Sequence, residues 1–376
     1  MKYICEYPSI PDDNKREYSL STVNKVNYIV SVLNQIGEKI EIISPAICKG
    51  KKACRGNRCN VSNDLTIILS PSIPHKTKLG YYLSHFFTKI WMLFFLLKNC
   101  KKGEIVFSYH GIIKIPFIKI AIRLKKIRIV LEVEEIYSKT NNKANNTMRF
   151  NLEKSMIAKS SAYIFASKEL ATNYSSGKPF VIATGAYTLS KRVVERLNDS
   201  KIHIVYAGLI QKDKAAFRCL KMAKYLNNKY VLHIIGYGDY DSIELLNDRI
   251  IKESYGCRVV FDGIKNGEDY IKYLQQCHIG LCPLDDDKEF QNACFPSKIT
   301  SYISNGLLVL TTKNEVLENS VYSPLIVFSD PTPEAFANKI KSINYKYDDS
   351  NGRKIVRELD QNFKNDILRM LNDIRK

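Results

Sequence analysis

The sequence predicts an α/β protein with two Rossmann-like, doubly wound parallel-sheet domains that face a cleft. Three observations lead to this prediction. Short apolar runs alternate with helical patterns along the chain, which is typical of parallel sheets covered by helices on both faces. One polar stretch near the middle interrupts the alternation. The length of 376 residues also suits two domains, since a domain usually has about 150 residues.

The first half opens with a short strand at 3–7, followed by a helix at 21–36 whose apolar residues recur at helical spacing. The basic stretch 49–58 is expected to be a solvated loop, and the basic residues of 114–128 are also expected to be solvated. Further strands are expected at 40–43, 65–69, 104–108, 127–133, 162–166 and 180–182, and further helices at 79–97, 115–124, 145–158 and 168–174.

The second half repeats the alternation more regularly. Strands are expected at 202–206, 231–235, 259–261, 279–283, 307–310 and 325–328, and helices at 214–226, 242–254, 267–276, 295–304, 316–321, 333–343 and 354–375. The sequence therefore indicates a first domain at 1–187, a linker at 188–200, a second domain at 201–350 and a C-terminal helix at 351–376. That helix is long enough to pack back on the first domain.

The stretch 292–306 carries the clearest chemical signal. It reads N-A-C-F-P-S-K-I-T-S-Y-I-S-N-G, and the apolar run 307–310 follows it. A Pro at the start and a Gly just past the end mark the limits of a helix. The first N–H groups of a helix have no intrahelical partner and attract anions. Pro296, Ser297 and Lys298 therefore predict a phosphate-binding helix start.

Two further groups follow strands of the second half. Gly208 is followed by Lys212 and Lys214, and a Gly lets the backbone approach a ligand while a Lys reaches a phosphate. Gly236 and Gly238 follow the next strand and fit either a ligand loop or a plain tight turn. A nicotinamide site is disfavoured because the third glycine of that fingerprint is missing.

The first half offers a histidine and two carboxylates at strand ends. His110 follows a strand and suits either a substrate contact or a structural role in the core. Glu134 and Glu135 also leave a strand, as a functional carboxylate or a solvated pair. No cluster has metal-ligand spacing, and the acidic run 285–287 is best interpreted as an exposed loop. We therefore expect no metal.

The net charge is +19, from 57 Lys and Arg against 38 Asp and Glu. A positive field of this size attracts nucleotides, nucleic acid or an acidic membrane face. No nucleic-acid recognition motif is present, so no specific nucleic acid is expected. The apolar stretch 79–97 ends in a basic segment and suits either a core helix or an interfacial helix. The cysteines lie mostly in apolar runs, which fits a reducing cytoplasm.

In serial order, the pieces of the second half resemble the donor domain of GT-B glycosyltransferases, most closely the retaining family 4. The resemblance runs from I-V-Y-A-G-L-I through I-I-G-Y-G, V-V-F-D-G and H-I-G-L-C-P-L to F-P-S-K-I-T-S-Y-I-S-N-G. In the first half, R-E-Y-S-L and L-E-V-E-E-I-Y-S resemble bacterial capsule and surface-polysaccharide transferases.

The resemblance implies a cytoplasmic, metal-independent enzyme that moves a sugar from a nucleoside-diphosphate donor to a growing glycan. The glycan would be lipid-linked, and the enzyme would contact the inner membrane face. The first domain would bind the acceptor and the second the nucleotide-sugar. The resemblance also implies roles for single residues. Lys214 and Lys298 would neutralise the leaving diphosphate, helped by Ser297. Gly208, Gly236 and Gly238 would let the backbone approach the donor, His110 would face the sugar, and Glu134 or Glu135 would contact sugar hydroxyls.

The sequence departs from the family pattern where paired Glu residues are common, because Ala293 and Ser301 stand there. The pattern therefore leaves open a degenerate, non-catalytic partner of another transferase. A nucleotide-sugar epimerase on the same architecture is the other alternative.

Overall fold

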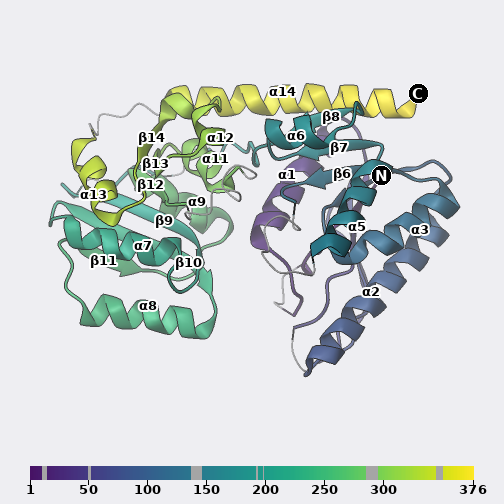
Figure 1. Ribbon diagram of the computed structural model, residues 1–376, viewed down its shortest axis with the longest axis horizontal. Helices are drawn as coiled ribbons and strands as arrows, with labels where there is room; N and C mark the ends of the chain where they lie inside the picture. The colour runs from purple at the N-terminus through teal and green to yellow at the C-terminus, as the bar shows by residue number, and fades with distance from the viewer. Residues whose placement is uncertain are drawn as a thin grey trace. The chain divides into compact units, whose positions relative to one another are not determined.

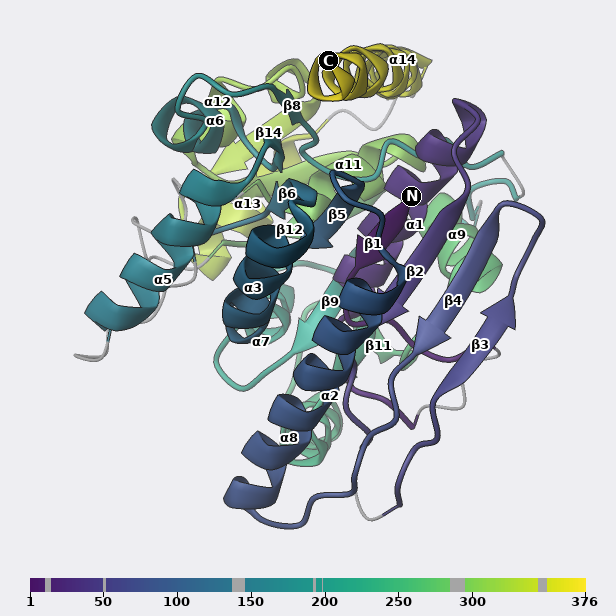
Figure 2. The same cartoon turned by 90° about the vertical axis from the view of Figure 1, so that its right-hand side faces the viewer.

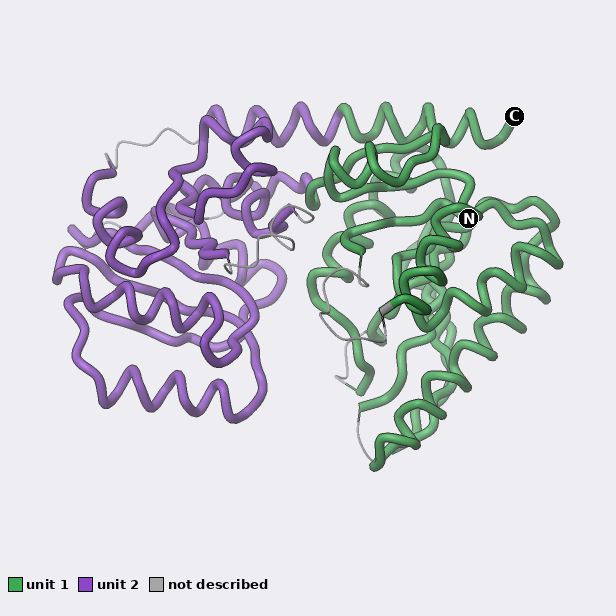
Figure 3. The backbone as a smooth tube through the Cα atoms, in the orientation of Figure 1, with its two compact units in different colours: residues 1–186, 362–376 green, residues 187–361 purple. Residues whose placement is uncertain are grey.

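The predicted alternation of strands and helices is present in the computed structural model, which describes residues 1–10, 15–49, 52–136, 146–191, 194–197, 199–284, 295–343 and 350–376. The chain divides into two units (Figure 3). Unit 1 comprises Met1–Ala186 and Asn362–Lys376, and unit 2 comprises Tyr187–Gln361. Each unit has its own parallel sheet covered by helices (Figure 1), so the predicted fold class is confirmed.

The sheet of unit 1 has the strand order β3-β4-β2-β1-β5-β6-β7-β8. All neighbouring strands are parallel except β3 and β4. The strands are β1 (Lys2–Ile4), β2 (Ile40–Ser44), β3 (Asn57–Asn60), β4 (Leu65–Leu69), β5 (Ile105–Tyr109), β6 (Arg128–Val133), β7 (Ala162–Phe165) and β8 (Phe180–Ile182).

The antiparallel edge strand β3 was not predicted from the sequence, which indicated a basic loop there. Its residues Asn-Arg-Cys-Asn are mostly exposed and show no apolar alternation. An edge strand needs only backbone pairing on one side, so a polar sequence can form it.

The helices of unit 1 lie close to their predicted positions. Lys25 is the one buried charge on the apolar stripe of α1, and Thr77 caps α2 by accepting from the Gly80 N–H. The helices are α1 (Leu20–Gln35), α2 (Lys78–Asn99), the short 3₁₀ turn η1 (Ile112–Lys114), α3 (Ile115–Lys125), α5 (Asn146–Lys159) and α6 (Lys168–Tyr174). Helices α2 and α3 lie side by side (Figure 2).

The sheet of unit 2 is entirely parallel in its described part, with the order β11-β10-β9-β12-β13-β14. Its strands are β9 (Ile202–Ile210), β10 (Tyr230–Gly238), β11 (Arg258–Phe261), β12 (Ile279–Cys282), β13 (Leu308–Thr312) and β14 (Ile326–Ser329). Its helical segments are α7 (Ala215–Met222), η2 (Ala223–Tyr225), α8 (Tyr240–Lys252), α9 (Gly267–Gln276), α11 (Ser297–Ser304), α12 (Glu315–Glu318), η3 (Ser323–Leu325) and α13 (Pro333–Ser342).

Strands β9 and β10 run further than the sequence indicated. Gly208, Gly236 and Gly238 lie inside these strands rather than in loops after them. Gly236 is in register with Gly208, and Gly238 with Ile210. The glycines therefore allow two extended strands to pair closely at their carboxyl ends.

The long helix α14 (Ser350–Arg375) belongs to both units. Near its start, Arg353 donates to the carbonyls of Ser304 and Ser190 in unit 2. Near its end, the Phe363 ring lies 5.4 Å from that of Tyr28, between centroids, and Arg128 donates to the carbonyl of Ile374, all in unit 1. Each half of the helix is therefore held by its own unit.

The segment after Ala186, which we expected to be a linker, groups with unit 2. Gln275 of α9 donates to the Lys191 carbonyl, and the Leu197 N–H donates to the Gln276 carbonyl. Hydrogen bonds therefore fix this segment to the second sheet's helices at both points.

Candidate functional site

Each sheet has one point where the strand order reverses. In unit 1 the chain departs in opposite directions from β1 and β5, and in unit 2 from β9 and β12. In open α/β sheets, ligands bind outside the carboxyl ends of the strands at such a point. These two positions, the unit 1 switch point and the unit 2 switch point, are where we describe candidate sites.

At the unit 2 switch point, Lys298 of α11 lies against β9. Its Nζ is 3.1 Å from the Tyr206 hydroxyl and 4.4 Å from the centre of the Tyr206 ring. A Cβ added to Gly208 would lie 2.5 Å from both Cε and Nζ of Lys298. The missing side chain of Gly208 is therefore what allows the ammonium to reach the end of β9.

No carboxylate pairs with Lys298 among the residues that the structure describes. Burial opposes the ammonium charge, but Tyr206, Cys282 and Cys219 together outweigh burial, and the pKa of Lys298 lies above its ordinary value. Lys298 therefore stays charged at neutral pH beside a phenol rather than a carboxylate. Such a cation is suited to an anionic ligand.

Two tyrosines hold this corner of unit 2. The Tyr302 hydroxyl accepts from the Ala207 N–H, and it donates to the Leu281 carbonyl of β12. The Tyr206 hydroxyl donates to the Leu209 carbonyl. A Cβ on Gly280 would collide with the Tyr302 ring at 2.4 Å. Helix α11 is therefore fixed closely against β9 and β12.

Helix α11 begins one residue later than its Pro suggested. Pro296 is the N-cap residue and Ser297 the first helical residue, so the prediction of Pro296 inside the first turn was wrong by one position. Its φ of −69° and ψ of 107° are extended, and its carbonyl accepts from the Ile299 N–H. No side chain caps the helix start, and Ser297 is exposed there.

The glycines of β9 and β10 pack backbone against backbone. A Cβ on Gly236 would lie 1.8 Å from the Gly208 carbonyl oxygen, and a Cβ on Gly238 would lie 2.1 Å from that of Ile210. Close strand packing therefore requires both glycines, which is a structural reason for them beside the predicted ligand role.

Lys212 and Lys214 lie in the connection from β9 to α7, where both are exposed. Lys214 is the N-cap residue of α7, and the Lys212 N–H donates to Ser242 Oγ. The structure therefore brings Gly208 and Lys298 together directly and places both loop lysines beyond the carboxyl end of β9. Asn292, Ala293, Cys294 and the acidic run 285–287 lie outside the described residues.

In unit 1, His110 follows β5 as predicted, but its side chain is buried. Nε2 lies 3.2 Å from Glu153 Oε1, and Nδ1 lies 3.2 Å from the Glu135 carbonyl oxygen. Burial, together with the nearby Lys114, lowers the pKa of His110 to about 4. The ring is therefore neutral and enclosed, and its contact with a sugar stays a prediction.

The carboxylates after β6 have different surroundings. Glu134 is partly exposed and pairs with Lys25, which also donates to the Ala183 carbonyl at 2.7 Å. Glu135 is also partly exposed. Glu132 is buried and accepts from the Tyr3 hydroxyl, and burial raises its pKa to about 8. Among the described residues of this strand end, Glu134 and Glu135 are therefore the partly exposed carboxylates, whereas Glu132 is buried.

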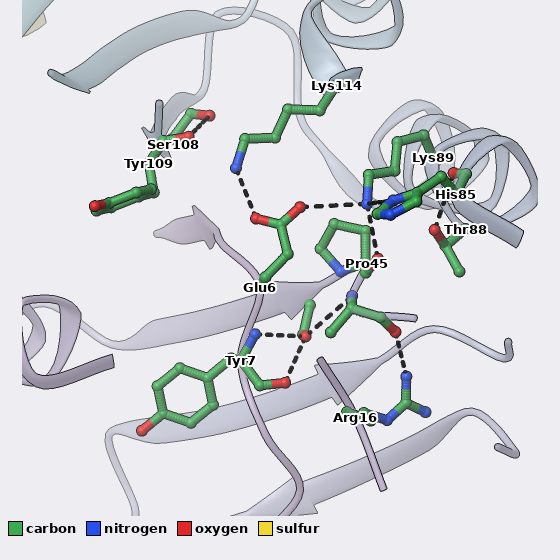
Figure 4. Close-up of polar contacts among 12 residues, drawn as sticks. Glu6, Tyr7, Arg16, Pro45, His85, Thr88, Lys89, Ser108, Tyr109 and Lys114 are labelled. Atoms are coloured by element: carbon green, nitrogen blue, oxygen red, sulfur yellow. Dashed lines mark hydrogen bonds and ion pairs between the residues drawn. The ribbon is translucent and has the colours of Figure 1, made fainter. Parts of the chain in front are cut away.

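A charged cluster that the sequence did not reveal lies at the unit 1 switch point (Figure 4). Glu6, just after β1, lies 3.2 Å from Lys89 Nζ and 3.1 Å from Lys114 Nζ. The lysine side chains are 1% and 2% exposed, whereas Glu6 is 32% exposed. Lys89 also donates to the Pro45 carbonyl after β2. The two lysines therefore hold a carboxylate at the carboxyl ends of β1 and β2.

The lysines keep Glu6 ionised. Burial favours the neutral acid, but Lys114 and Lys89 outweigh it and hold the pKa of Glu6 well below its ordinary value. His85 adjoins Lys89, with Nδ1 3.4 Å from Nζ, and burial lowers the pKa of His85 to about 4. Because an ammonium can only donate, Nδ1 accepts and Nε2 carries the proton.

The sequence offered only a weak signal for this cluster. Lys89 stands within an apolar helix, where a buried charge needs a partner, but nothing local identified Glu6. Lys114 belonged to a basic stretch that we expected to be solvated. That expectation was wrong for Lys114, because the turn η1 directs it inward to Glu6.

Comparisons with known proteins agree with this architecture. Residues 189–358 match the family model of Glycosyl transferases group 1. No curated protein matches the chain in sequence. Sucrose-phosphate synthase from Thermosynechococcus elongatus has a similar structure, with a TM-score of 0.74 and 12% identity, over 99% of this chain and 98% of that chain.

Two further solved structures are similar over almost their whole length. One is described as trehalose-6-phosphate from E. coli bound with UDP-2-fluoro glucose, with a TM-score of 0.68 and 9% identity, covering 100% of this chain and 98% of that chain. The other is HepE of Anabaena in complex with UDP and glucose, with a TM-score of 0.65 and 11% identity, covering 99% of each chain. At these identities the likeness shows a shared fold.

Proposed function

We propose that this chain, a GT-B glycosyltransferase by the match of residues 189–358 and by its fold, transfers a sugar from a nucleoside-diphosphate donor bound at the unit 2 switch point. The observation that carries the proposal is Lys298, a half-buried lysine whose ammonium reaches the end of β9 beside Gly208 and has no carboxylate partner among the described residues. A diphosphate would supply the missing negative charge.

The proposed mechanism stabilises the leaving group. As the bond between sugar and diphosphate breaks, negative charge grows on the phosphate oxygens, and fixed positive groups lower the energy of that state. Lys298 provides such a charge, and the N–H groups at the start of α11 with Ser297 add donors. Lys212 and Lys214, beyond β9, would contact the same diphosphate. The proposed transfer needs no metal ion.

We assign the acceptor side to unit 1. His110 would orient the sugar, and Glu134 and Glu135 would accept hydrogen bonds from hydroxyl groups. The partial exposure of the two carboxylates supports this role. Lys25 pairs with Glu134 and holds this carboxylate at the strand end. Glu153 and the Glu135 carbonyl contact both ring nitrogens of His110, so its role toward the sugar requires the ring to become accessible to a substrate.

The finer proposal is a retaining enzyme of family 4 that extends a lipid-linked glycan of a surface polysaccharide, such as a capsule, at the inner face of the cell membrane. Support comes from the L-E-V-E-E-I-Y-S resemblance around Glu134. Ser301, where a Glu is common in that family, favours as the alternative a non-catalytic partner that binds a nucleotide without transferring its sugar.

Thermal-shift measurements with UDP, GDP and ADP, followed by assays of nucleotide release from UDP-glucose, UDP-N-acetylglucosamine, GDP-mannose and ADP-glucose, test this proposal. A ligand that binds only the folded state raises the melting temperature. We expect one nucleotide to stabilise the chain and its sugar to be hydrolysed or transferred. Binding without turnover supports the non-catalytic partner, and no binding of any nucleotide refutes the donor site.

A further inference from the structure

Helix α2 exposes an unusually apolar face for a helix on a protein surface. Three of its five buried residues are polar or charged, the five being Ser84, Thr88, Lys89, Met92 and Leu96. Its exposed residues are mostly aromatic and aliphatic, whereas a surface helix normally buries its apolar stripe. Six large apolar side chains of α2 are 44–69% exposed, namely Leu79, Tyr82, Leu83, Phe86, Phe87 and Phe94.

The inner contacts explain why α2 cannot turn its apolar face inward. Lys89 is tied to Glu6 and the Pro45 carbonyl, and Ser84 donates to the Ile73 carbonyl at 3.0 Å. Rotating the helix would break these bonds and deprive the Glu6 carboxylate and the Pro45 and Ile73 carbonyls of these partners. The exposed position of the aromatic residues is therefore imposed by the core of unit 1.

Helix α3 continues the apolar face. Phe86 of α2 packs edge-on against Phe117 of α3, with ring centres 5.9 Å apart, and α3 adds the exposed Ile120 and Leu124. The two helices lie side by side in both views (Figures 1 and 2). Together α2 and α3 form one surface, the α2–α3 face, which is larger than a scatter of single exposed residues.

The charge on this part of the chain has a single sign. No Asp or Glu occurs from 65 to 103 or from 105 to 131. Lys and Arg side chains are exposed at both ends of α2 and along α3, among them Lys78, Lys98 and Arg123. An apolar face with a basic border is complementary to an anionic lipid surface.

We propose that the α2–α3 face docks on the surface of an anionic lipid bilayer, with its aromatic residues in the headgroup region and its lysines and arginines against lipid phosphates. No helix in the described part of the chain is both long and apolar enough to span a membrane, so this contact is peripheral. A second copy of the chain is a poorer occupant, because a two-fold interface would bring two cationic faces together.

Co-sedimentation of the full chain with lipid vesicles tests the proposal. The vesicles contain phosphatidylcholine alone, or phosphatidylcholine and phosphatidylglycerol in equal parts. We expect at least tenfold tighter binding to the anionic vesicles, because each Lys or Arg at such a surface adds about 1 kcal/mol. Raising the salt from 0.1 to 0.5 M should weaken binding, because salt screens this attraction. No binding to the anionic vesicles, or equal binding to both kinds, would overturn the proposal.

A pair of double variants tests the apolar part. Phe87→Ser with Phe94→Ser removes two exposed rings of the face, and Tyr240→Ser with Ile251→Ser removes two side chains of α8 in unit 2 that are 76% and 79% exposed. The first pair should lower vesicle affinity at least tenfold, and the second should leave it unchanged. Equal losses of vesicle affinity in the two double variants would contradict docking through the α2–α3 face.

Charge reversal tests the basic border in the same way. The double variant Lys98→Glu with Arg123→Glu should lose the preference for anionic lipid. The control is Lys221→Glu with Lys229→Glu, two exposed positions of unit 2. The control changes the net charge equally and should keep the preference for anionic lipid. If the wild type binds no vesicles but forms a dimer in light scattering, the face is a self-interface and the proposal fails. Nucleotide binding without vesicle binding would refute docking alone and leave the proposed donor site intact.

Discussion

The two switch points of this molecule differ in the group that lies against their lysines. In unit 1, the ammonium groups of Lys89 and Lys114 share the carboxylate of Glu6. In unit 2, Lys298 lies against the Tyr206 phenol, with no carboxylate partner among the described residues. Both sites place lysines at the carboxyl ends of parallel strands, buried in unit 1 and half-buried in unit 2. Among the described residues, only the unit 1 site supplies a carboxylate to pair with its lysines.

The difference indicates what each unit can bind. Where a carboxylate already balances the lysines, the group left at the surface is an acceptor of hydrogen bonds, suited to hydroxyl groups. Where a lysine has only a phenol, an anionic ligand gains the full attraction. This contrast supports the proposal that the donor diphosphate binds to unit 2 and that sugar hydroxyls bind to unit 1.

The largest expected effect comes from removing the uncompensated charge. Lys298→Met should lower the rate of sugar transfer about 10²- to 10³-fold, as does the loss of one group that stabilises transition-state charge. Its free energy of unfolding should fall only slightly, because the raised pKa of Lys298 shows that the folded state favours the ammonium. Initial rates with the identified nucleotide-sugar, together with urea denaturation, measure both.

Lys313→Met is the matched control for that variant. Lys313 follows β13 in the same unit, is 63% exposed and pairs with Asp330 at 3.6 Å. It should change neither rate nor stability appreciably. A Lys298→Met enzyme with wild-type turnover would show that the unit 2 switch point does not hold the diphosphate.

Removing the carboxylate from the Glu6 cluster of unit 1 should mainly lower stability, whereas Lys298→Met mainly lowers the rate of transfer. Glu6→Gln leaves Lys89 and Lys114 without a carboxylate, and we expect the free energy of unfolding to fall by about 2–3 kcal/mol, below the range for a fully buried pair because Glu6 is partly exposed. Because the pKa of Glu6 is held well below its ordinary 4.5, its contribution is present above that pH and is lost as the pH falls towards the folded-state pKa.

Urea denaturation at pH 7 and pH 4 should therefore show a difference between the wild type and Glu6→Gln that narrows in acid. The control is Glu104→Gln. Glu104 pairs with the buried Lys2 at 2.6 Å at the start of β5, but Lys2 keeps Glu41 at 3.9 Å, so the loss should be about 1 kcal/mol or less. Equal losses in the two variants would contradict the special position of Glu6.

The smallest expected effect concerns the glycines beside the lysines. An added Cβ would lie 2.5 Å from Lys298 Cε at Gly208, but 3.1 Å from Lys114 Cε at Gly111. Gly208→Ala should displace Lys298, lower transfer about tenfold and cost about 1 kcal/mol of stability. Gly111→Ala should cost less than about 0.5 kcal/mol. If Gly111→Ala loses more activity than Gly208→Ala, the assignment of the diphosphate to the unit 2 switch point is contradicted.

Much of the fold follows from local signals. The helix 168–174 and the strand 180–182 were predicted at their observed bounds, because Ser167 caps the helix and the strand is a short apolar run. The edge strand β3 escaped prediction because its polar residues carry no periodic pattern. Strands β9 and β10 run past their first glycines, since register with the neighbouring strand outweighs the low strand propensity of Gly.

The candidate sites likewise contain features that the sequence predicts and features that depend on the tertiary structure. By itself the sequence determined the order of strands and helices apart from β3, and the position of Lys298 at a helix start, because these depend on neighbours along the chain. Only the tertiary structure decided that His110 is enclosed, that Lys89 and Lys114 turn inward, and that α2 exposes its aromatic residues. Glu6 and Lys114 are 108 residues apart in sequence, and such partners meet only when the parallel strands that carry them are brought together in one sheet.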